Sequence, residues 1–373
     1  MSDLEGYRAS FETEPGYLDW AAFGPLSPRV RDEMHGDAEL LGTGRGSSID
    51  LVRGHTDVAR ELLGELLDTD ADEVTLQPST TYGLMQALYG LRGALLVARG
   101  EFPSLAVTAA RAAALREDLH VQWMEPEHGF VTPDAVRSAL TDETTAVAVS
   151  LVDFRTGYLT DLGALRDVID DRLLIVDAIQ GFGVTDADYA AADVVCGNGY
   201  KWLRAGRGTG WARFGARALE RLEPALSGFA GADVDLPLDE TPGVASTAQR
   251  FRVTADDMLA SGRLATALEE VRDAGVPAIA DAVADRADEL IGYADGHGIP
   301  VVTPHERERR AGIVVLRPDA SDVSALSAAL VNRGVTFTAR AGSVRLAVHA
   351  GTDDDSMRLL VEALAAYATY RAR

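Results

Sequence analysis

The sequence predicts an α/β protein with a mainly parallel seven-stranded sheet in a large domain, followed by a smaller C-terminal α+β domain. Short apolar runs alternate with stretches of helical pattern through the first two thirds of the chain, as in sheets that carry helices on both faces. Some of these runs end in polar residues, which is typical of buried parallel strands whose C-terminal ends line a ligand crevice. The length of 373 residues suits two domains better than one core.

The larger part of the chain contains the seven predicted strands of the main sheet and six predicted helices. The strands are short apolar runs, and they cover Val74–Leu76, Ala94–Ala98, His120–Met124, Ala146–Leu151, Leu173–Val176, Asp193–Cys196 and Gly210–Phe214. The helices have a helical pattern of apolar residues, and they cover Pro28–Leu41, Thr56–Leu67, Thr81–Tyr89, Ser104–Arg116, Thr132–Ala139 and Leu162–Ile169.

The pattern changes after about Pro242, where long helical stretches replace the regular alternation. Helices are predicted at Ala255–Asp273, Pro277–His297, Asp322–Arg333 and Asp354–Tyr370, and strands at Gly312–Leu316 and Val344–Val348. Residues Gly228–Pro242, which are rich in glycine, aspartate and proline, are the predicted boundary. We therefore predict a large domain over residues 17–242 and a small domain made of residues 1–16 and 243–373.

Composition excludes several classes of function. The formal net charge of −23 disfavours nucleic acid and anionic membranes as partners, because phosphate binding requires clustered cations. A single cysteine, Cys196, excludes an intramolecular disulfide and a cysteine-based zinc cluster, and we expect no metal site. The N-terminus has neither the basic nor the apolar region of a signal peptide, and no apolar run approaches the roughly 20 residues of a membrane span. A cytoplasmic location is expected.

The most informative residues are Asp177 and Lys201. Asp177 directly follows one predicted strand, and Lys201 lies just beyond the next, so parallel strands would present both side chains to the same cleft. A lysine that forms a Schiff base and a carboxylate that pairs with a pyridinium nitrogen are what pyridoxal 5'-phosphate (PLP) chemistry requires. A lysine is more often a solvated surface residue, but Gly197 and Gly199 allow close backbone approach to a ligand.

Two further positions suit the same cofactor. The segment from Gln77 to Gly83 follows a strand and opens a helix, and free N–H groups at a helix N-terminus beside hydroxyls form an anion site. The alternative is that Ser79 or Thr80 only caps the helix. Phe102 lies at the end of a strand, where an aromatic ring can lie flat on a pyridine ring or belong to the core.

With these residues in place, the chain resembles the class V aminotransferase family of PLP enzymes, fold type I, and within it the kynureninase-like and cysteine-desulfurase-like members. The order and spacing of the matching segments carry the resemblance. They are YLDWAAFGPL (17–26), TLQPSTTYGL (75–84), GEFPS (100–104), TGYLTDL (156–162), VDAIQGFG (176–183), GNGYKWLRAGRGTG (197–210), AQRFRVT (248–254) and VRLAVHAGT (344–352).

The resemblance implies a set of residues around the cofactor phosphate. Thr80 and Thr81 occupy the phosphate-binding positions of the family, and Tyr200 matches its phosphate-binding aromatic residue. Asn198 stands where many relatives have serine. Thr254 matches a residue that reaches the phosphate from a partner subunit, which implies a homodimer with shared active sites.

The resemblance also implies residues around the cofactor ring and the substrate. Gln180 would hydrogen-bond the phenolic oxygen of the ring, and Asp153 would contact the ring edge or the surroundings of Asp177. Lys201 would act as general base and acid at the substrate α-carbon. Arg345 would bind the α-carboxylate, because a guanidinium fork fits a carboxylate with two hydrogen bonds.

Departures from the family pattern narrow the reaction. A cysteine desulfurase needs a mobile cysteine, whereas Cys196 falls in a predicted buried strand. The Asn-Pro-Pro of kynureninases is Ala255-Asp256-Asp257 here. We predict an enzyme that acts on a small amino acid by transamination or by β-elimination as a lyase. The alternatives are a kynureninase-like C–C hydrolase and a non-catalytic PLP-fold regulator, which the short N-terminal segment and the negative charge disfavour.

Overall fold

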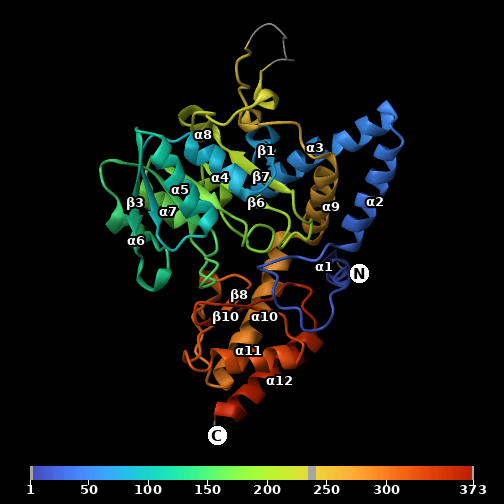
Figure 1. Cartoon of the computed structure of the whole chain (residues 1–373), viewed down its shortest axis with the longest axis vertical. Coiled ribbons are helices and arrows are strands. Elements are labelled where there is room, and N and C mark those ends of the chain that lie inside the picture. The colour runs from blue at the N-terminus through green and yellow to red at the C-terminus, as the bar shows by residue number, and fades with distance from the viewer. Residues whose placement is uncertain (1–2, 234–240, 372–373) are drawn as a thin grey trace.

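The computed structural model describes residues 3–233 and 241–371, arranged in two bodies around two sheets (Figure 1). The larger sheet consists of β1 (Val74–Gln77), β2 (Gly93–Ala98), β3 (Leu119–Met124), β4 (Thr144–Ser150), β5 (Leu173–Asp177), β6 (Val194–Asn198) and β7 (Gly210–Phe214). Its strand order is β1-β7-β6-β5-β4-β2-β3. Strand β7 is antiparallel to both of its neighbours, β1 and β6, and the other neighbouring pairs are parallel. This confirms the predicted mainly parallel sheet of seven strands.

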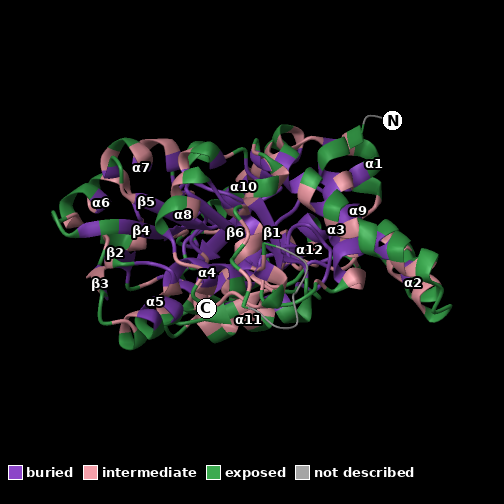
Figure 2. Ribbon diagram, turned by 90° about the horizontal axis from the view of Figure 1, so that it is seen from above, coloured by how far each residue is buried: buried purple, intermediate pink, exposed green. Residues whose placement is uncertain are grey.

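Helices cover both faces of the large sheet. Successive side chains of a strand point to opposite faces, and both sets are apolar here. In β4, Ala146 and Ala148 pack into one buried cluster, whereas Val147 and Val149 pack into another. The first cluster includes residues of α4 (Thr80–Tyr89), α5 (Pro103–Leu115) and α8 (Ala216–Arg221). The second includes residues of α3 (Gly46–Leu67), α6 (Pro133–Ala139), α7 (Leu162–Ile169) and α9 (Met258–Ala274). Viewed from above, buried residues fill the centre between exposed helical faces (Figure 2).

The smaller sheet has the strand order β8-β10-β9. It consists of β8 (Ile313–Leu316), β9 (Thr338–Arg340) and β10 (Ser343–Ala347), all antiparallel. One face packs on α10 (Val276–Gly296), α11 (Val323–Asn332) and α12 (Asp354–Arg371) through a separate apolar cluster. The N-terminal segment joins this body, since Tyr17 and Asp19 form bridges to Thr336 and Ala347.

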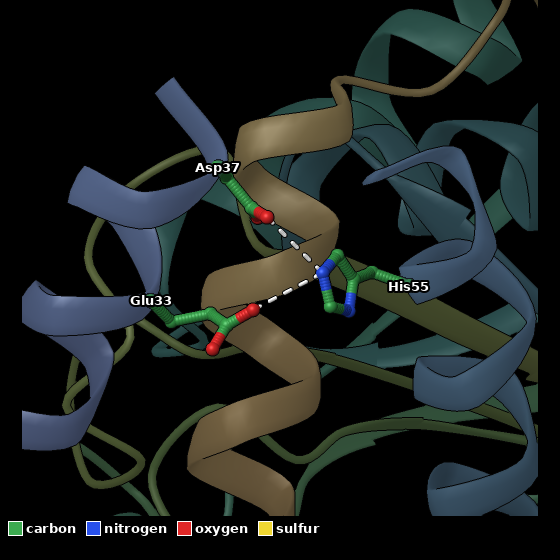
Figure 3. Close-up of side chains that lie close together, drawn as sticks. All are labelled: Glu33, Asp37 and His55. Carbon is green, nitrogen blue, oxygen red and sulfur yellow. Dashed lines mark hydrogen bonds and ion pairs between the residues drawn. The ribbon is translucent and has the colours of Figure 1, made fainter. Parts of the chain in front are cut away.

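Helix α9 packs along α2 (Pro28–Gly42) and α3, while α10 runs from that body towards the small sheet (Figure 1). Where these helices meet, His55 of α3 lies 3.1 Å from Glu33 and 3.2 Å from Asp37 of α2, measured from its Nε2 (Figure 3). Asp37 is only 2% exposed, so the cluster ties α2 to α3 from within. The helix α1 (Asp3–Ala9) contacts α9 as well.

The predicted division into two domains stays a prediction. Its boundary segment, Gly228–Pro242, includes residues 234–240, which lie outside the described residues. None of the helices in the described part of the chain is long and apolar enough to cross a membrane.

Candidate active site

Asp177 and Lys201 lie at the same edge of the large sheet. Asp177 is the last residue of β5, and Lys201 follows the end of β6 by three residues. These neighbouring strands run parallel, with Asp177 paired to Cys196, so their C-terminal ends point the same way. The two side chains are 2% and 5% exposed. An ionisable pair buried this deeply at strand ends is typical of a ligand site.

Burial controls the charges of this pair. It lowers the pKa of Lys201 to about 7, opposed by Asp177 and reinforced by the positive charges of Arg345 and Arg207. Burial raises the pKa of Asp177 to about 6, opposed by a hydrogen bond from the Ile179 N–H and by Lys201. An amine with a pKa near neutrality exchanges protons readily at physiological pH.

Two buried polar atoms near this pair have no partner among the described residues. Oδ1 of Asp177 accepts a hydrogen bond from the Ile179 N–H at 3.1 Å, but its Oδ2 accepts none. The hydroxyl of Thr80 is also without a partner. Both residues line a cavity of about 280 Å³. Because buried polar groups are normally satisfied, the cavity suits a ligand with a ring N–H at one end and an anionic oxygen at the other, as PLP has.

The start of α4 lines the part of this cavity that suits an anion. Ser79 caps the helix by accepting a hydrogen bond from the Tyr82 N–H at 3.4 Å. The cap therefore leaves the Thr80 hydroxyl free, and Thr81 bonds instead to Ser104, with 2.8 Å between the hydroxyl oxygens. The first turn has no acidic residue, so its N–H groups and the helix dipole favour a phosphate there.

The end of β6 and the loop after it also line this cavity. Oδ1 of Asn198 accepts hydrogen bonds from the Tyr200 N–H and from the Thr209 hydroxyl, both at 3.2 Å. Arg207 lines the same cavity, with its guanidinium carbon 4.5 Å from the centre of the Tyr200 ring. Sequence reasoning missed Arg207. The sequence feature that could have indicated Arg207 is the pair of glycines on either side of it. Gly206 and Gly208 have φ angles of 75° and 89° and turn the chain sharply around Arg207.

Aromatic rings enclose the lysine amine. Its Nζ lies 5.8 Å from the centre of the Phe102 ring and 5.5 Å from that of Tyr200. Phe102 stands edge-on to Phe154, with 5.1 Å between ring centres. It lines both the 280 Å³ cavity and a neighbouring one that contains Lys201. This position allows the ring-stacking role predicted for Phe102.

Gln180 lines the neighbouring cavity with a fixed side-chain orientation. The Trp202 indole N–H donates to its Oε1 at 2.9 Å, and its Nε2 donates to the Ala21 carbonyl at 3.0 Å. The indole is only a donor and the carbonyl only an acceptor, so the amide cannot be reversed. One N–H of Gln180 remains for a further acceptor, which agrees with its predicted contact to a ring oxygen.

Asp153 and Glu101 are two further buried carboxyl groups of this region. Oδ1 of Asp153 accepts hydrogen bonds from the N–H groups of Arg155 and Thr156, each at 2.8 Å, and thereby fixes a turn. Asp153 lines neither cavity, and its predicted cofactor contact stays a prediction. Glu101, which sequence reasoning missed, accepts hydrogen bonds from the Ser150 N–H and hydroxyl. Burial raises the pKa of Glu101 to about 7.

Arg345 reaches the site from the small sheet. It lines the cavity of about 410 Å³ that also contains Lys201, and its Nη2 lies 3.4 Å from Asp19 and 3.3 Å from the Thr338 hydroxyl. Its Nε has no partner among the described residues. The predicted carboxylate-binding arginine thus faces the predicted lysine across the two bodies of the molecule.

Thr254 is not brought to this site within one chain. It is exposed and lines a different cavity, of about 390 Å³, together with Tyr82 and Gly208. Its predicted contact with a phosphate therefore depends on a second subunit and stays a prediction.

Lys201 is the only lysine in the sequence, since 34 of the 35 basic residues are arginine. This count is a sequence signal that motif reasoning did not use. It means that the sole lysine amine of the chain is the one buried beside Asp177.

Comparisons with known proteins identify the family and the fold of this chain. The family model for class V aminotransferases matches residues 17–354. The cysteine desulfurase IscS of Ectopseudomonas mendocina is 29% identical over 192 residues, which are 47% of this chain and 46% of IscS, so the match spans about half of that relative. The kynureninase of Deinococcus radiodurans is 27% identical over 278 residues, 70% of this chain and 66% of that enzyme.

Solved structures share the fold over nearly the whole chain. The cystine C–S lyase C-DES, in complex with its reaction product cysteine persulfide, has a TM-score of 0.86 at 18% identity and covers 95% of this chain and 98% of its own. Another C-DES structure, with glycine covalently linked to its PLP cofactor, has a TM-score of 0.87. The predicted fold type I is confirmed, and PLP is supported as the cofactor. Because the family model matches most of its length, this chain belongs to the class V aminotransferase family.

Proposed function

We propose that the protein is a PLP-dependent enzyme that acts on a small amino acid at its α-carbon, by transamination or by β-elimination. The observation that carries the proposal is the buried pair of Lys201 and Asp177, with the unpartnered Asp177 Oδ2 and Thr80 hydroxyl in the adjoining cavity. When bound, PLP supplies an electron sink for the negative charge that develops at the α-carbon. Lys201 would anchor it covalently, with Asp177 at its ring nitrogen and Thr80, Thr81, Asn198 and Tyr200 around its phosphate.

The residues of this chain divide the remaining work. Arg345 would hold the substrate carboxylate and so orient the α-carbon towards Lys201. With its pKa lowered to about 7, Lys201 has a large neutral fraction at physiological pH and can take a proton from the α-carbon and return it. Asp177 would remain ionised, because a cationic partner at Oδ2 favours the charged form of a carboxyl.

The covalent anchor can be tested with unusual precision because the chain has one lysine. We expect the purified protein to be yellow with PLP and, after reduction with borohydride, to carry the cofactor on the peptide that contains Lys201. Lys201→Ala should lose both signals, and the N-terminal amine is the only other primary amine that could react. A protein that stays colourless with added PLP, or a Lys201→Ala variant that still traps PLP, would overturn the assignment.

Product analysis separates the reactions. A 2-oxo acid formed only in the presence of an acceptor oxo acid indicates transamination, whereas ammonia and pyruvate released without an acceptor indicate β-elimination. A second candidate is kynureninase-like C–C hydrolysis, which the match to a kynureninase over 70% of this chain favours. Release of anthranilate from kynurenine would identify it. The buried Cys196 argues against a persulfide carried on a cysteine.

We also propose a cytoplasmic homodimer with shared active sites. The homodimer is supported by Thr254, which is exposed and which the family pattern assigns to the phosphate site of the neighbouring subunit. The location is proposed together with the absence of a membrane-spanning helix among the described helices.

A further inference from the structure

The cavity that holds Lys201 is strongly cationic although the protein is strongly acidic. The basic residues among its lining residues are Arg155, Arg317, Arg340, Arg345 and Lys201, and no aspartate or glutamate of the described part of the chain lines it. The whole chain has 58 acidic and 35 basic residues. A cavity of this sign in a chain of this composition indicates a preference for anionic ligands.

The small sheet delivers three of these arginines on one face. Side chains two residues apart on a strand point the same way. Arg340, Arg345 and Arg317 each lie two residues after another lining residue, namely Thr338, Ser343 and Val315. Arg340 is paired with Ser343, and Leu316 with Val344. Continued by one residue, this register places Arg317 on the other side of Ser343. Two like charges thus flank one position, about 10 Å apart across two strand spacings.

Arg317 and Arg340 have no counter-charge among the described residues. Arg345 is paired with Asp19 at 3.4 Å, and Arg155 lies 3.7 Å from Asp153. Within the described part of the chain, neither Arg317 nor Arg340 has a carboxylate at ion-pair distance. The cofactor phosphate does not explain them, because its proposed site is the adjoining cavity with Thr80 and Arg207. One substrate carboxylate does not explain them either, since Arg345 is available for it.

We propose that the substrate is an amino acid whose side chain ends in a second oxyanion, which Arg317 and Arg340 bind while Arg345 binds the α-carboxylate. The proposal rests on the proposed function and adds the substrate class to it. Guanidinium groups suit this task because their fork matches the oxygens of carboxylates and of sulfur or phosphorus oxyacids. The cavity volume of about 410 Å³ is within the usual range for small-ligand sites.

Equilibrium binding of unreactive ligands tests this substrate class without turnover. We would measure, by calorimetry on the PLP-loaded protein, the Kd of succinate and glutarate against butyrate and valerate, which have the same chain lengths with one carboxylate. The dicarboxylates should bind about tenfold more tightly or better, as expected for a charge-assisted hydrogen-bonded pair. The double variant Arg317→Gln, Arg340→Gln should lose this advantage. 3-Sulfopropionate, compared with succinate, tells whether the second group is a carboxylate or a sulfonate.

Arg333→Gln is the matched control, because Arg333 belongs to the same small body but pairs with Glu362 outside the cavity. It should keep the dicarboxylate preference. Equal affinities for mono- and dicarboxylates would overturn the proposal, as would a double variant that changes only the oligomeric state. Failure of the proposed function would look different from failure of this proposal. In the first case PLP would not bind at Lys201, whereas the arginine variants should leave PLP binding at Lys201 intact.

Discussion

Glu101 provides a quantitative test of the electrostatics at the sheet edge. It is 7% exposed and hydrogen-bonded to Ser150, and burial raises its pKa from 4.5 to about 7. Because the folded protein holds this proton more tightly than the unfolded chain, the two states differ little below pH 4.5. As the pH rises from 4.5 to 7, the unfolded chain releases the proton first, so the folded state loses stability, and above pH 7 the loss is complete.

The size of the effect follows from the two pKa values. With 4.5 for the unfolded chain and about 7 for the folded protein, the carboxyl destabilises the fold by about 1 kcal/mol at pH 5 and about 3 kcal/mol at pH 8. Glu101→Gln keeps the shape and can still accept from the Ser150 N–H, while its NH2 group can donate to the Ser150 hydroxyl oxygen. The amide does not titrate. The free energy of unfolding of the variant minus that of the wild type should therefore rise by about 2 kcal/mol between pH 5 and pH 8.

Urea unfolding of the protein without PLP measures this difference, since bound cofactor would stabilise the folded state by mass action. Glu125→Gln is the control, because Glu125 is 77% exposed and its removal changes the net charge equally. If the difference between Glu101→Gln and the wild type stayed constant within about 0.5 kcal/mol from pH 5 to pH 8, burial would not control this carboxyl.

Three further predictions address the roles of single residues. Asp177→Asn should still bind PLP but lose turnover on the order of 100-fold, as when a fixed electrostatic stabiliser is removed; near wild-type turnover would contradict its role at the ring nitrogen. Arg345→Ala should weaken the apparent affinity for amino acids by roughly tenfold or more while leaving amines without a carboxylate unaffected, and equal losses for both would exclude a carboxylate contact. Mixing inactive Lys201→Ala protein with Thr254→Val protein should restore activity if sites are shared, because one site of each hybrid dimer combines an intact Lys201 with an intact Thr254. Sedimentation should show a dimer, and an active monomer would refute this assembly.

The sequence predicted the large sheet well because each of its strands is an isolated apolar run. Gly210–Phe214 and the helix Leu162–Ile169 have the predicted bounds. The strand Thr338–Arg340 was missed, since it is three residues long and none of its residues is buried. Helix α3 begins at Gly46, ten residues before the predicted start at Thr56. Most residues of these first turns are exposed or half-buried, although Val52 is buried.

The site was only partly predictable, because local sequence pattern places some of its residues and tertiary packing places the others. Asp177, Lys201 and Thr80 follow strands, so local pattern places them at the sheet edge. Which hydroxyl caps α4 and which stays free is decided by backbone geometry, and the sequence left both alternatives open. Arg317 and Arg340 come from a sheet far along the chain, and only tertiary packing places them beside Lys201. Thr254 shows the limit of single-chain reasoning, because its predicted role requires a second subunit.

The choice of arginine over lysine throughout the chain has a chemical consequence at this site. A cationic cavity built with lysines would offer several amines to an aldehyde cofactor, and burial would lower the pKa of each and make it nucleophilic. Arginine keeps its charge and has no such amine. With four arginines and one lysine lining the cavity, positive charge for binding anions is separated from the single amine available for covalent chemistry. Anion recognition can therefore change in this cavity, residue by residue, without creating a second covalent anchor.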